Sequence, residues 1–279
     1  MNGKFLLINF AILPLILISG CMEIPNKLSS ESNSSENLTA CVPAIGSDIL
    51  FQVSTIDALL QGVYDGVLTI GELKTHGDFG IGTIDGLEGE MLALDGNYYQ
   101  IKTDGIAYPV SEGLTTPFAT VTYFEADKNF LLEEPMNLTE FEQYLDLHLP
   151  AENLFYAVKI DGNFTYLKAR SVPKQEKPYP LLSDVVSNQT IFEFENVSGT
   201  LVGFRTPEYV KGVNVPGYHL HFITADRTSG GHVLDFELED GNISLDTTNA
   251  FFMELPTGGD FCEIELGQDL QAEMETVEK

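Results

Sequence analysis

A seven-residue stretch, 217–223, reads Gly-Tyr-His-Leu-His-Phe-Ile and places two histidines one residue apart. Side chains of a β-strand alternate between faces, so His219 and His221 project from one face and the apolar neighbours project from the other. A third histidine, His232, follows Gly-Gly at 230–231, and the chain has five histidines in all. Three grouped imidazoles are typical of a catalytic zinc site, whose fourth position stays open. The alternative is that the strand histidines are polar filler and His232 is an ordinary loop residue.

The connection between the two histidine segments decides whether they can share a metal. A tight turn at Arg227–Gly230 would separate His221 from His232 by about four residues along the ladder, roughly 13 Å. A shared metal therefore requires a wide loop through Ala225 to Gly231, which the glycines permit, or a different strand pairing. The sequence does not decide between the wide loop and the different strand pairing.

Residues 1–21 have the pattern of a lipoprotein signal peptide. Lys4 supplies a positive charge, an apolar run covers 5–18, and Ile-Ser-Gly-Cys ends at Cys21. This ending resembles the lipobox of lipoproteins, in which the cysteine carries the lipid. The apolar run is short for the alternative, a transmembrane helix. We therefore predict an exported protein, lipid-anchored through Cys21 to the outer face of the cell membrane.

The next segment, residues 22–40, is polar and rich in serine, which predicts a flexible tether. Two cysteines remain beyond Cys21, at Cys41 and Cys262. In an oxidising compartment such a pair favours a disulfide, which here would join the beginning of the folded part to its end. Two free thiols are the alternative.

Charge restricts the classes of partner. The formal net charge is −28, although a hydrophobic content of 43% is normal for a globular core. This charge argues against nucleic acid, whose phosphates would be repelled. It also argues against electrostatic attraction to anionic lipid, so membrane contact is expected only through the anchor at Cys21.

The remaining patterns predict a sheet-rich protein of mixed α/β or α+β class, with two packed β-sheet halves and a few helices. A helix is expected to begin at Ser54–Asp57 and to end at Asp65-Gly66, with apolar positions recurring at Ile56, Leu59, Leu60 and Val63. Asp95-Gly96-Asn97 predicts a hairpin turn. Asp161-Gly162-Asn163 predicts another turn, between strands 154–160 and 164–170. The proline-rich segment 173–180 predicts a boundary between an N-terminal sheet domain (41–178) and a C-terminal zinc-binding sheet domain (179–279).

A zinc enzyme also needs groups that move protons and hold anionic oxygens. Glu90 lies on a predicted strand in phase with Glu88, so one or both can face a cavity. With 42 acidic residues in the chain, most glutamates are surface residues. Arginine is scarce, and Arg170 ends a predicted strand, where it can clamp a carboxylate or only cover a surface.

Several blocks together resemble the alpha-acetolactate decarboxylase family, in order from about residue 48 to the end. These blocks are Gly71–Thr83 (GELKTHGDFGIGT), Leu87–Glu90 (LEGE), Lys168–Pro173 (KARSVP), Gly217–Phe222 (GYHLHF) and Asp226–His232 (DRTSGGH). The paired HGDFGIGT and GYHLHF…GGH blocks are far more specific than a lone HxH.

The resemblance implies a zinc ion held by His219, His221 and His232, and polar groups beside it from Glu90, Arg170 and a glutamate of the tail. The tail role is placed on Glu278; Glu275 or Glu273 are possible, and Glu254 is a rival. The family fold implied is a two-domain α/β dimer.

The activity implied is decarboxylation of 2-acetolactate to acetoin and CO₂. In this scheme the metal stabilises an enediolate, Arg170 orients the carboxylate, and Glu90 or the tail glutamate delivers a proton to one face. Two alternatives remain: an exported zinc hydrolase, and a non-catalytic lipoprotein that binds zinc or a small ligand.

Overall fold

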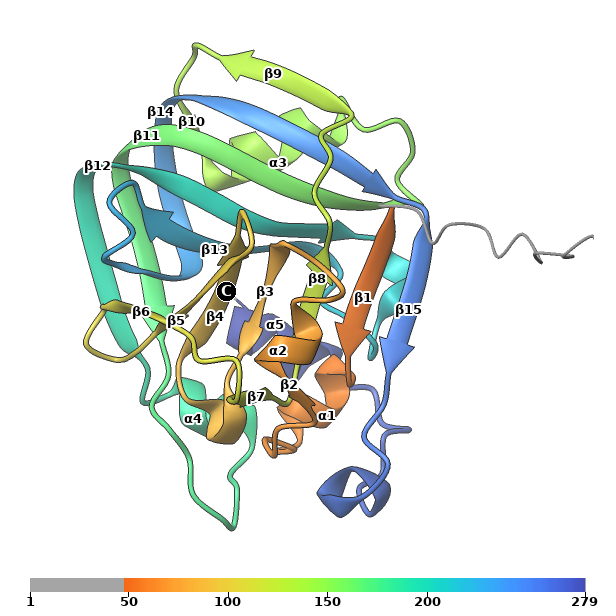
Figure 1. The fold of residues 1–279 in the computed structure, drawn as a ribbon. Helices are drawn as coiled ribbons and strands as arrows, with labels where there is room; N and C mark the ends of the chain where they lie inside the picture. Colours follow the sequence, from red (N-terminus) through yellow and green to blue (C-terminus); the bar gives the residue numbers. More distant parts are fainter. Residues whose placement is uncertain (1–47, 279) are drawn as a thin grey trace, which may run out of the picture. The chain divides into compact units, whose positions relative to one another are not determined.

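The computed structural model describes residues 48–278, in which a seven-stranded sheet combines segments from both ends of the chain (Figure 1). Its strands, in spatial order, are β15 (Ala250–Glu254), β1 (Ile49–Val53), β8 (Ala119–Thr122), β3 (Phe79–Thr83), β4 (Glu90–Leu94), β5 (Asn97–Ile101) and β6 (Ala107–Pro109). β15 runs parallel to β1, and the other neighbours are antiparallel. The predicted hairpin is confirmed, because Asp95 and Gly96 have the positive φ of a tight turn between β4 and β5.

The second sheet closes on itself. Its strands are β10 (Met136–Asn137), β14 (Gly230–Thr248), β11 (Phe155–Ser171), β12 (Thr190–Thr206) and β13 (Gly217–Thr224), with β9 (Lys128–Leu132) beside β14. Because β13 pairs with both β12 and β14, the strands β11, β12, β13 and β14 form a ring. A small separate sheet joins β2 (Leu68–Thr69) to β7 (Thr115–Thr116).

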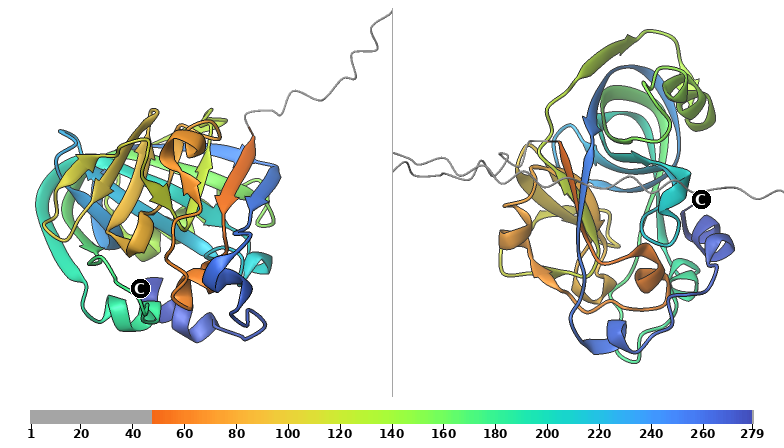
Figure 2. Two further views of the ribbon diagram at one scale, coloured as in Figure 1. Left: turned by 60° about the horizontal axis from the view of Figure 1, so that its bottom comes forward. Right: turned by 90° about the vertical axis from the view of Figure 1, so that its right-hand side faces the viewer.

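The turn predicted at Asp161-Gly162-Asn163 is wrong, because β11 continues through it as one strand of 17 residues. Gly162 lies opposite Gly199 of β12 and Gly241 of β14, so three glycines form a row across three neighbouring strands. A Cβ on Gly162 would lie 2.7 Å from a methyl group of Leu238. The row permits close approach of these strands, and Figure 2 shows that the long strands of this sheet are strongly curved.

Helices lie at both ends of the sheets in Figure 1, one beside β10 and β14 and three packed together at the other end. They are α1 (Ile56–Leu60), α2 (Ile70–Leu73), α3 (Leu138–Asp146), α4 (Leu182–Val186) and α5 (Gln271–Glu278), with short 3₁₀ turns at Asp85–Leu87, Glu208–Val210 and Gly259–Cys262. The start of the predicted first helix is confirmed, and Thr55 caps it by accepting a hydrogen bond from the Ala58 N–H. The helix ends at Leu60, so the end predicted at Asp65-Gly66 is wrong. Within residues 48–278, no helix is both long and apolar enough to span a membrane.

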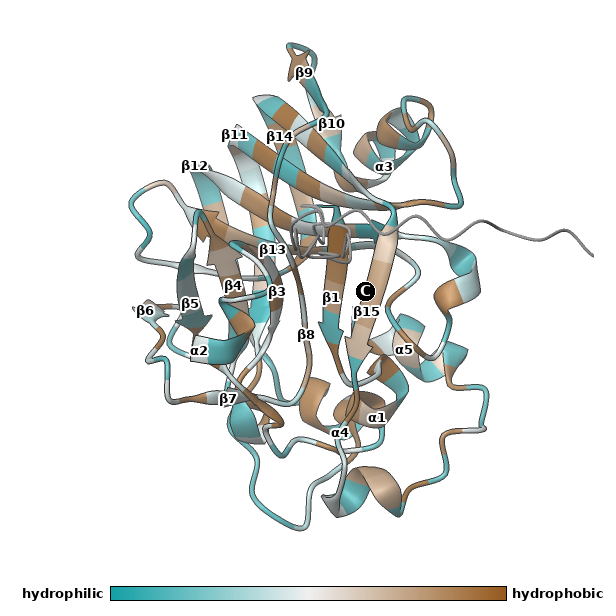
Figure 3. Ribbon diagram, turned by 45° about the vertical axis from the view of Figure 1, so that its right-hand side comes forward, coloured by the Kyte–Doolittle hydropathy of each residue, from teal (hydrophilic) through white to brown (hydrophobic). Residues whose placement is uncertain are grey.

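The core consists of apolar clusters on and between the two sheets. Brown and teal alternate along β11, β12 and β14 in Figure 3, as expected for strands with one buried face. One cluster joins the sheets and includes Phe79 and Leu92 of the first sheet with Val202 and Ile223 of the second. Another cluster brings together α1, α4 and α5. The predicted sheet-rich class is thus confirmed.

Some predictions concern residues outside the described part. These are the signal peptide (1–21), its Cys21, the tether (22–40) and Cys41 of the predicted disulfide; Cys262 is exposed. The domain boundary at residue 178 stays a prediction. Strand pairing runs across this boundary, because β11 pairs with β12 and β1 pairs with β15.

Candidate active site

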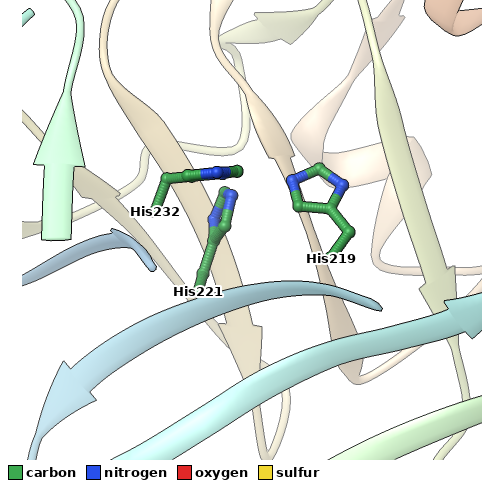
Figure 4. Close-up of side chains that lie close together, drawn as sticks. All are labelled: His219, His221 and His232. Carbon is green, nitrogen blue, oxygen red and sulfur yellow. The ribbon is translucent and has the colours of Figure 1, made fainter. Parts of the chain in front are cut away.

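Two neighbouring strands bring the three histidines together, with their rings turned toward one another (Figure 4). His221 of β13 lies directly opposite His232 of β14, and His219 projects from the same face two residues earlier. The connection is the wide loop, residues 225–229, closed by a hydrogen bond from the Thr224 N–H to the Ser229 carbonyl. A Cβ on Gly230 would collide with the Phe222 carbonyl, so glycine is required where the strands approach.

The three imidazoles form a compact, buried group. Their ring centroids lie 5.0 to 5.3 Å apart, and one nitrogen from each ring lies within 4.8 Å of the other two. The exposed fractions are 9% for His219, 1% for His221 and 2% for His232. Three nitrogen ligands at this spacing, excluded from water, are suited to a transition metal.

Hydrogen bonds fix two of these rings. The Nδ1–H of His221 donates to the Met91 carbonyl at 2.9 Å, and His232 bonds to the backbone of Glu278. Such bonds to the outer side of a ligand hold its tautomer and orientation. Burial is the main cause that lowers the pKa of His219 to about 3 and the pKa values of His221 and His232 well below their usual range. The rings are therefore neutral, which is the state that binds metals.

Two glutamates approach the histidines from different sides. Glu90, at the beginning of β4 in the first sheet, places Oε2 3.7 Å from His221 Nε2. Glu278, at the end of α5, places Oε2 3.6 Å from His219 Nε2 and 3.8 Å from His232 Nε2. Burial raises the pKa of each carboxyl to about 7, although the charge of Arg170 opposes the shift.

Arg170 completes the group from a fourth strand, β11. It lies opposite His232 where β11 pairs with β14, and only 4% of it is exposed. The structure thus brings together all six predicted site residues, from five different elements. Their predicted roles remain predictions.

Four atoms of this group are buried without a hydrogen-bond partner: Arg170 Nε, His221 Nε2, His232 Nε2 and Glu278 Oε2. Each unpaired buried polar atom costs about 1–3 kcal/mol, so native proteins seldom collect them without an occupant. Imidazole nitrogens and carboxylate oxygens are ligands that zinc accepts. The donor set therefore fits a metal ion held by the three histidines.

An apolar wall faces these polar groups across a cavity of about 40 Å³. The sequence pattern places Ile56 and Leu59 on the apolar side of a helix and predicts no site role for Phe118, Val172 or Leu182. All five line this cavity. A periodic apolar pattern shows that side chains are buried but does not distinguish a core from a cavity wall.

The remaining glutamates and histidines considered as candidates lie outside this group. Glu88 pairs with Lys102 at 2.7 Å, and Glu254 ends β15. His76 stacks on Phe51, and His148 bonds to the Tyr144 carbonyl, so both are outside the group.

The fold and the site together define a sheet-rich protein with a buried, metal-competent polar centre beside an apolar wall. The family model for alpha-acetolactate decarboxylase matches residues 50–268. The chain belongs to the alpha-acetolactate decarboxylase family, which confirms the resemblance seen in the sequence.

Individual relatives agree. An alpha-acetolactate decarboxylase of Methanosarcina mazei is 69% identical, covering 94% of this chain and 93% of the relative. The Bacillus subtilis enzyme is 44% identical over 82% of this chain and 90% of its own length. A crystal structure of alpha-acetolactate decarboxylase from Bacillus subtilis strain 168 superposes with a TM-score of 0.81, covering 82% of this chain and 99% of that chain.

Proposed function

We propose that this chain decarboxylates 2-acetolactate to acetoin and CO₂ with a zinc ion held by His219, His221 and His232. Family membership supports the reaction. The observation that carries the zinc assignment is the buried set of three neutral imidazoles, two of which have unpartnered nitrogens. When bound, zinc would supply Lewis-acid polarisation of the substrate carbonyl and stabilise negative charge on its oxygens.

Arg170 would hold the substrate carboxylate. Its guanidinium is permanently charged, is buried and has an unpartnered Nε–H, so it can donate to an incoming anion. The same contact orients the bond that breaks. When CO₂ leaves, the electron pair of that bond remains on the substrate carbon, which must then receive one proton.

Glu90 or Glu278 would deliver this proton. Both pKa values are raised to about 7, so either carboxyl can hold a proton near neutral pH and release it to a more basic carbon. They approach the histidines from different elements, so only one is expected to face the reacting carbon. Delivery to a single face gives one enantiomer of acetoin. The deprotonated glutamate recovers its proton from solvent, which balances the reaction.

The test is release of CO₂ and acetoin from racemic acetolactate by residues 41–279, with and without a metal chelator. We expect one acetoin enantiomer, formed only while metal is bound. Turnover that persists in demonstrably metal-free protein would refute the zinc assignment. A folded, zinc-loaded protein that releases no product would refute the substrate assignment.

A zinc hydrolase would use the same histidines and a glutamate base, but it gives no reason to bury Arg170 beside them. Ester or amide turnover without CO₂ release would favour it. A protein that only captures zinc or a small ligand would take up metal stoichiometrically without turnover.

We also propose that the protein is exported, lipid-anchored through Cys21, and a homodimer. The signal-like residues 1–21 support the anchor, and the family resemblance suggests the dimer. Cys21→Ser should move the protein from the membrane fraction to the soluble fraction. Light scattering of residues 41–279 should give twice the chain mass.

A further inference from the structure

The cavity beside the three histidines is too small for the substrate of the proposed reaction. Its volume is about 40 Å³, and each water needs about 10–15 Å³ measured in this way, so the cavity has room for about three waters. Acetolactate has about nine non-hydrogen atoms, each nearly as large as a water. The cavity must therefore widen before substrate can contact Arg170 and the histidines.

A large groove lies on the side of α5 that faces away from this cavity. It has a volume of about 640 Å³, and its lining includes Arg205, Tyr218, Met274, Glu275 and Glu278. Glu278 is also part of the cavity lining. The end of α5 therefore separates the groove from the cavity, and α5 lies at the outside of the fold in Figure 2.

Fewer buried side chains and hydrogen bonds hold α5 in place than hold the strands and α1, which also line the cavity. Two of its side chains are buried, Met274 at 6% and Val277 at 1% exposure, while the four other residues at 272–276 are exposed. The hydrogen bonds of residues 271–277 are local, from Gln271 to Asp269 and Glu275 and from Thr276 to Ala272. By contrast, the strands that carry Glu90, Arg170 and the histidines are bonded within sheets, and every residue of α1 is buried.

We propose that α5 is the gate of the active site, latched by Met274 and Val277. Both latch residues pack into the cluster that contains the cavity-wall residues Leu59 and Leu182. Undocking of α5 withdraws Glu278 from the histidines and connects the cavity to the groove. Docking returns the Glu278 carboxyl and restores the backbone hydrogen bond that holds His232. The same movement of α5 therefore controls both the entry of substrate and the placing of Glu278 beside the histidines.

The proposal can be tested without metal, substrate or turnover, and so independently of the proposed function. In metal-free protein, diethyl pyrocarbonate reacts with neutral imidazoles that solvent can reach, and mass spectrometry locates the modified histidine. His219, His221 and His232 are buried, whereas His148 is exposed and provides an internal reference. The rate at the three buried histidines thus reports how often the cavity opens.

Val277→Ala removes two buried methyl groups from the latch. We expect modification of the three cavity histidines to become about tenfold faster, equivalent to about 1.4 kcal/mol, while His148 is unaffected. Thr276→Ala, on the exposed side of the same helix, should leave all rates unchanged. Val158→Ala makes the same chemical change at a fully buried site of β11. It should weaken the whole fold without accelerating modification to the same degree.

Three results would overturn the gate. They are equal rates in Val277→Ala and the unaltered protein, equal acceleration by Val158→Ala, and cavity histidines that react as fast as His148 before any substitution. If Val277→Ala does not fold, hydrogen exchange of the unaltered protein replaces it. The amides of residues 274–277 must then exchange faster than those of β11, and identical protection refutes the proposal.

Discussion

Asp246 is a buried carboxyl outside the active site, and its ionisation should contribute to how stability depends on pH. It lies on β14 with 1% of its surface exposed, and its Oδ2 accepts a hydrogen bond from the Glu125 N–H. Burial, assisted by the negative charges of Asp48, Asp127 and Glu125, raises its pKa from 3.8 to about 7. We predict that Asp246→Asn stabilises the protein at pH 8.

The sign and size follow from proton linkage. Between pH 4 and 7 the folded state holds a proton at Asp246 that the unfolded state has lost, so the free energy of unfolding falls as pH rises. Each unit between the two pKa values corresponds to about 1.36 kcal/mol, which sets an upper limit of about 4 kcal/mol above pH 7. Asparagine has no charge to bury, and its carbonyl oxygen can still accept from Glu125. We expect a gain of about 2–4 kcal/mol at pH 8 and almost none at pH 4.

Urea unfolding of the variant and the unaltered protein at both pH values measures this difference. Other buried carboxyls, including Glu90, contribute equally to both proteins and cancel. Asp235→Asn removes an exposed carboxyl from the same strand and should have little effect at either pH. A gain for Asp246→Asn that does not depend on pH would refute the linkage argument, because it would show that packing rather than ionisation separates the two proteins.

Three further outcomes test the active site. His219→Ala should abolish zinc retention, measured by metal analysis after dialysis, and reduce kcat/KM to background; normal metal content would contradict its place in the ligand set. Arg170→Lys keeps the charge but loses the planar fork, so KM should rise and kcat/KM should fall about 10²-fold or more; unchanged kinetics would remove Arg170 from carboxylate binding. Raising ionic strength from about 0.01 M to 0.15 M shortens the Debye length from about 30 to 8 Å. Repulsion between an anionic substrate and a protein of charge −28 should therefore weaken, and KM should fall. A KM that rises with salt would show that local attraction by Arg170 dominates.

The histidine group could be predicted from the sequence because it depends on local rules. Strand alternation puts His219 and His221 on one face, and Gly230 permits the close return that brings His232 opposite. The position of Arg170 beside them depends on which strand pairs with β14, and no local pattern specifies that. Glu278 is similarly placed by the docking of a helix, so its assignment required the family resemblance.

The long strands show why a local turn signal can fail. Asp161-Gly162-Asn163 has turn chemistry, but β12 and β14 bond to both sides of it and hold the backbone extended. The glycine serves close packing in a curved sheet instead, since a Cβ there would collide with Leu238. The residues of one segment do not reveal this row of glycines, because it forms only when three strands pair.

The five-residue loop between β13 and β14 has a consequence for the order of folding. His219, His221 and His232 all lie within one hairpin, so bringing them together closes only a short loop and has a small entropic cost. Glu90, Arg170 and Glu278 must come from distant parts of the sequence. A metal ion can therefore bind the hairpin while the rest of the chain is still assembling, and by binding there it would stabilise the strand register that the finished site requires.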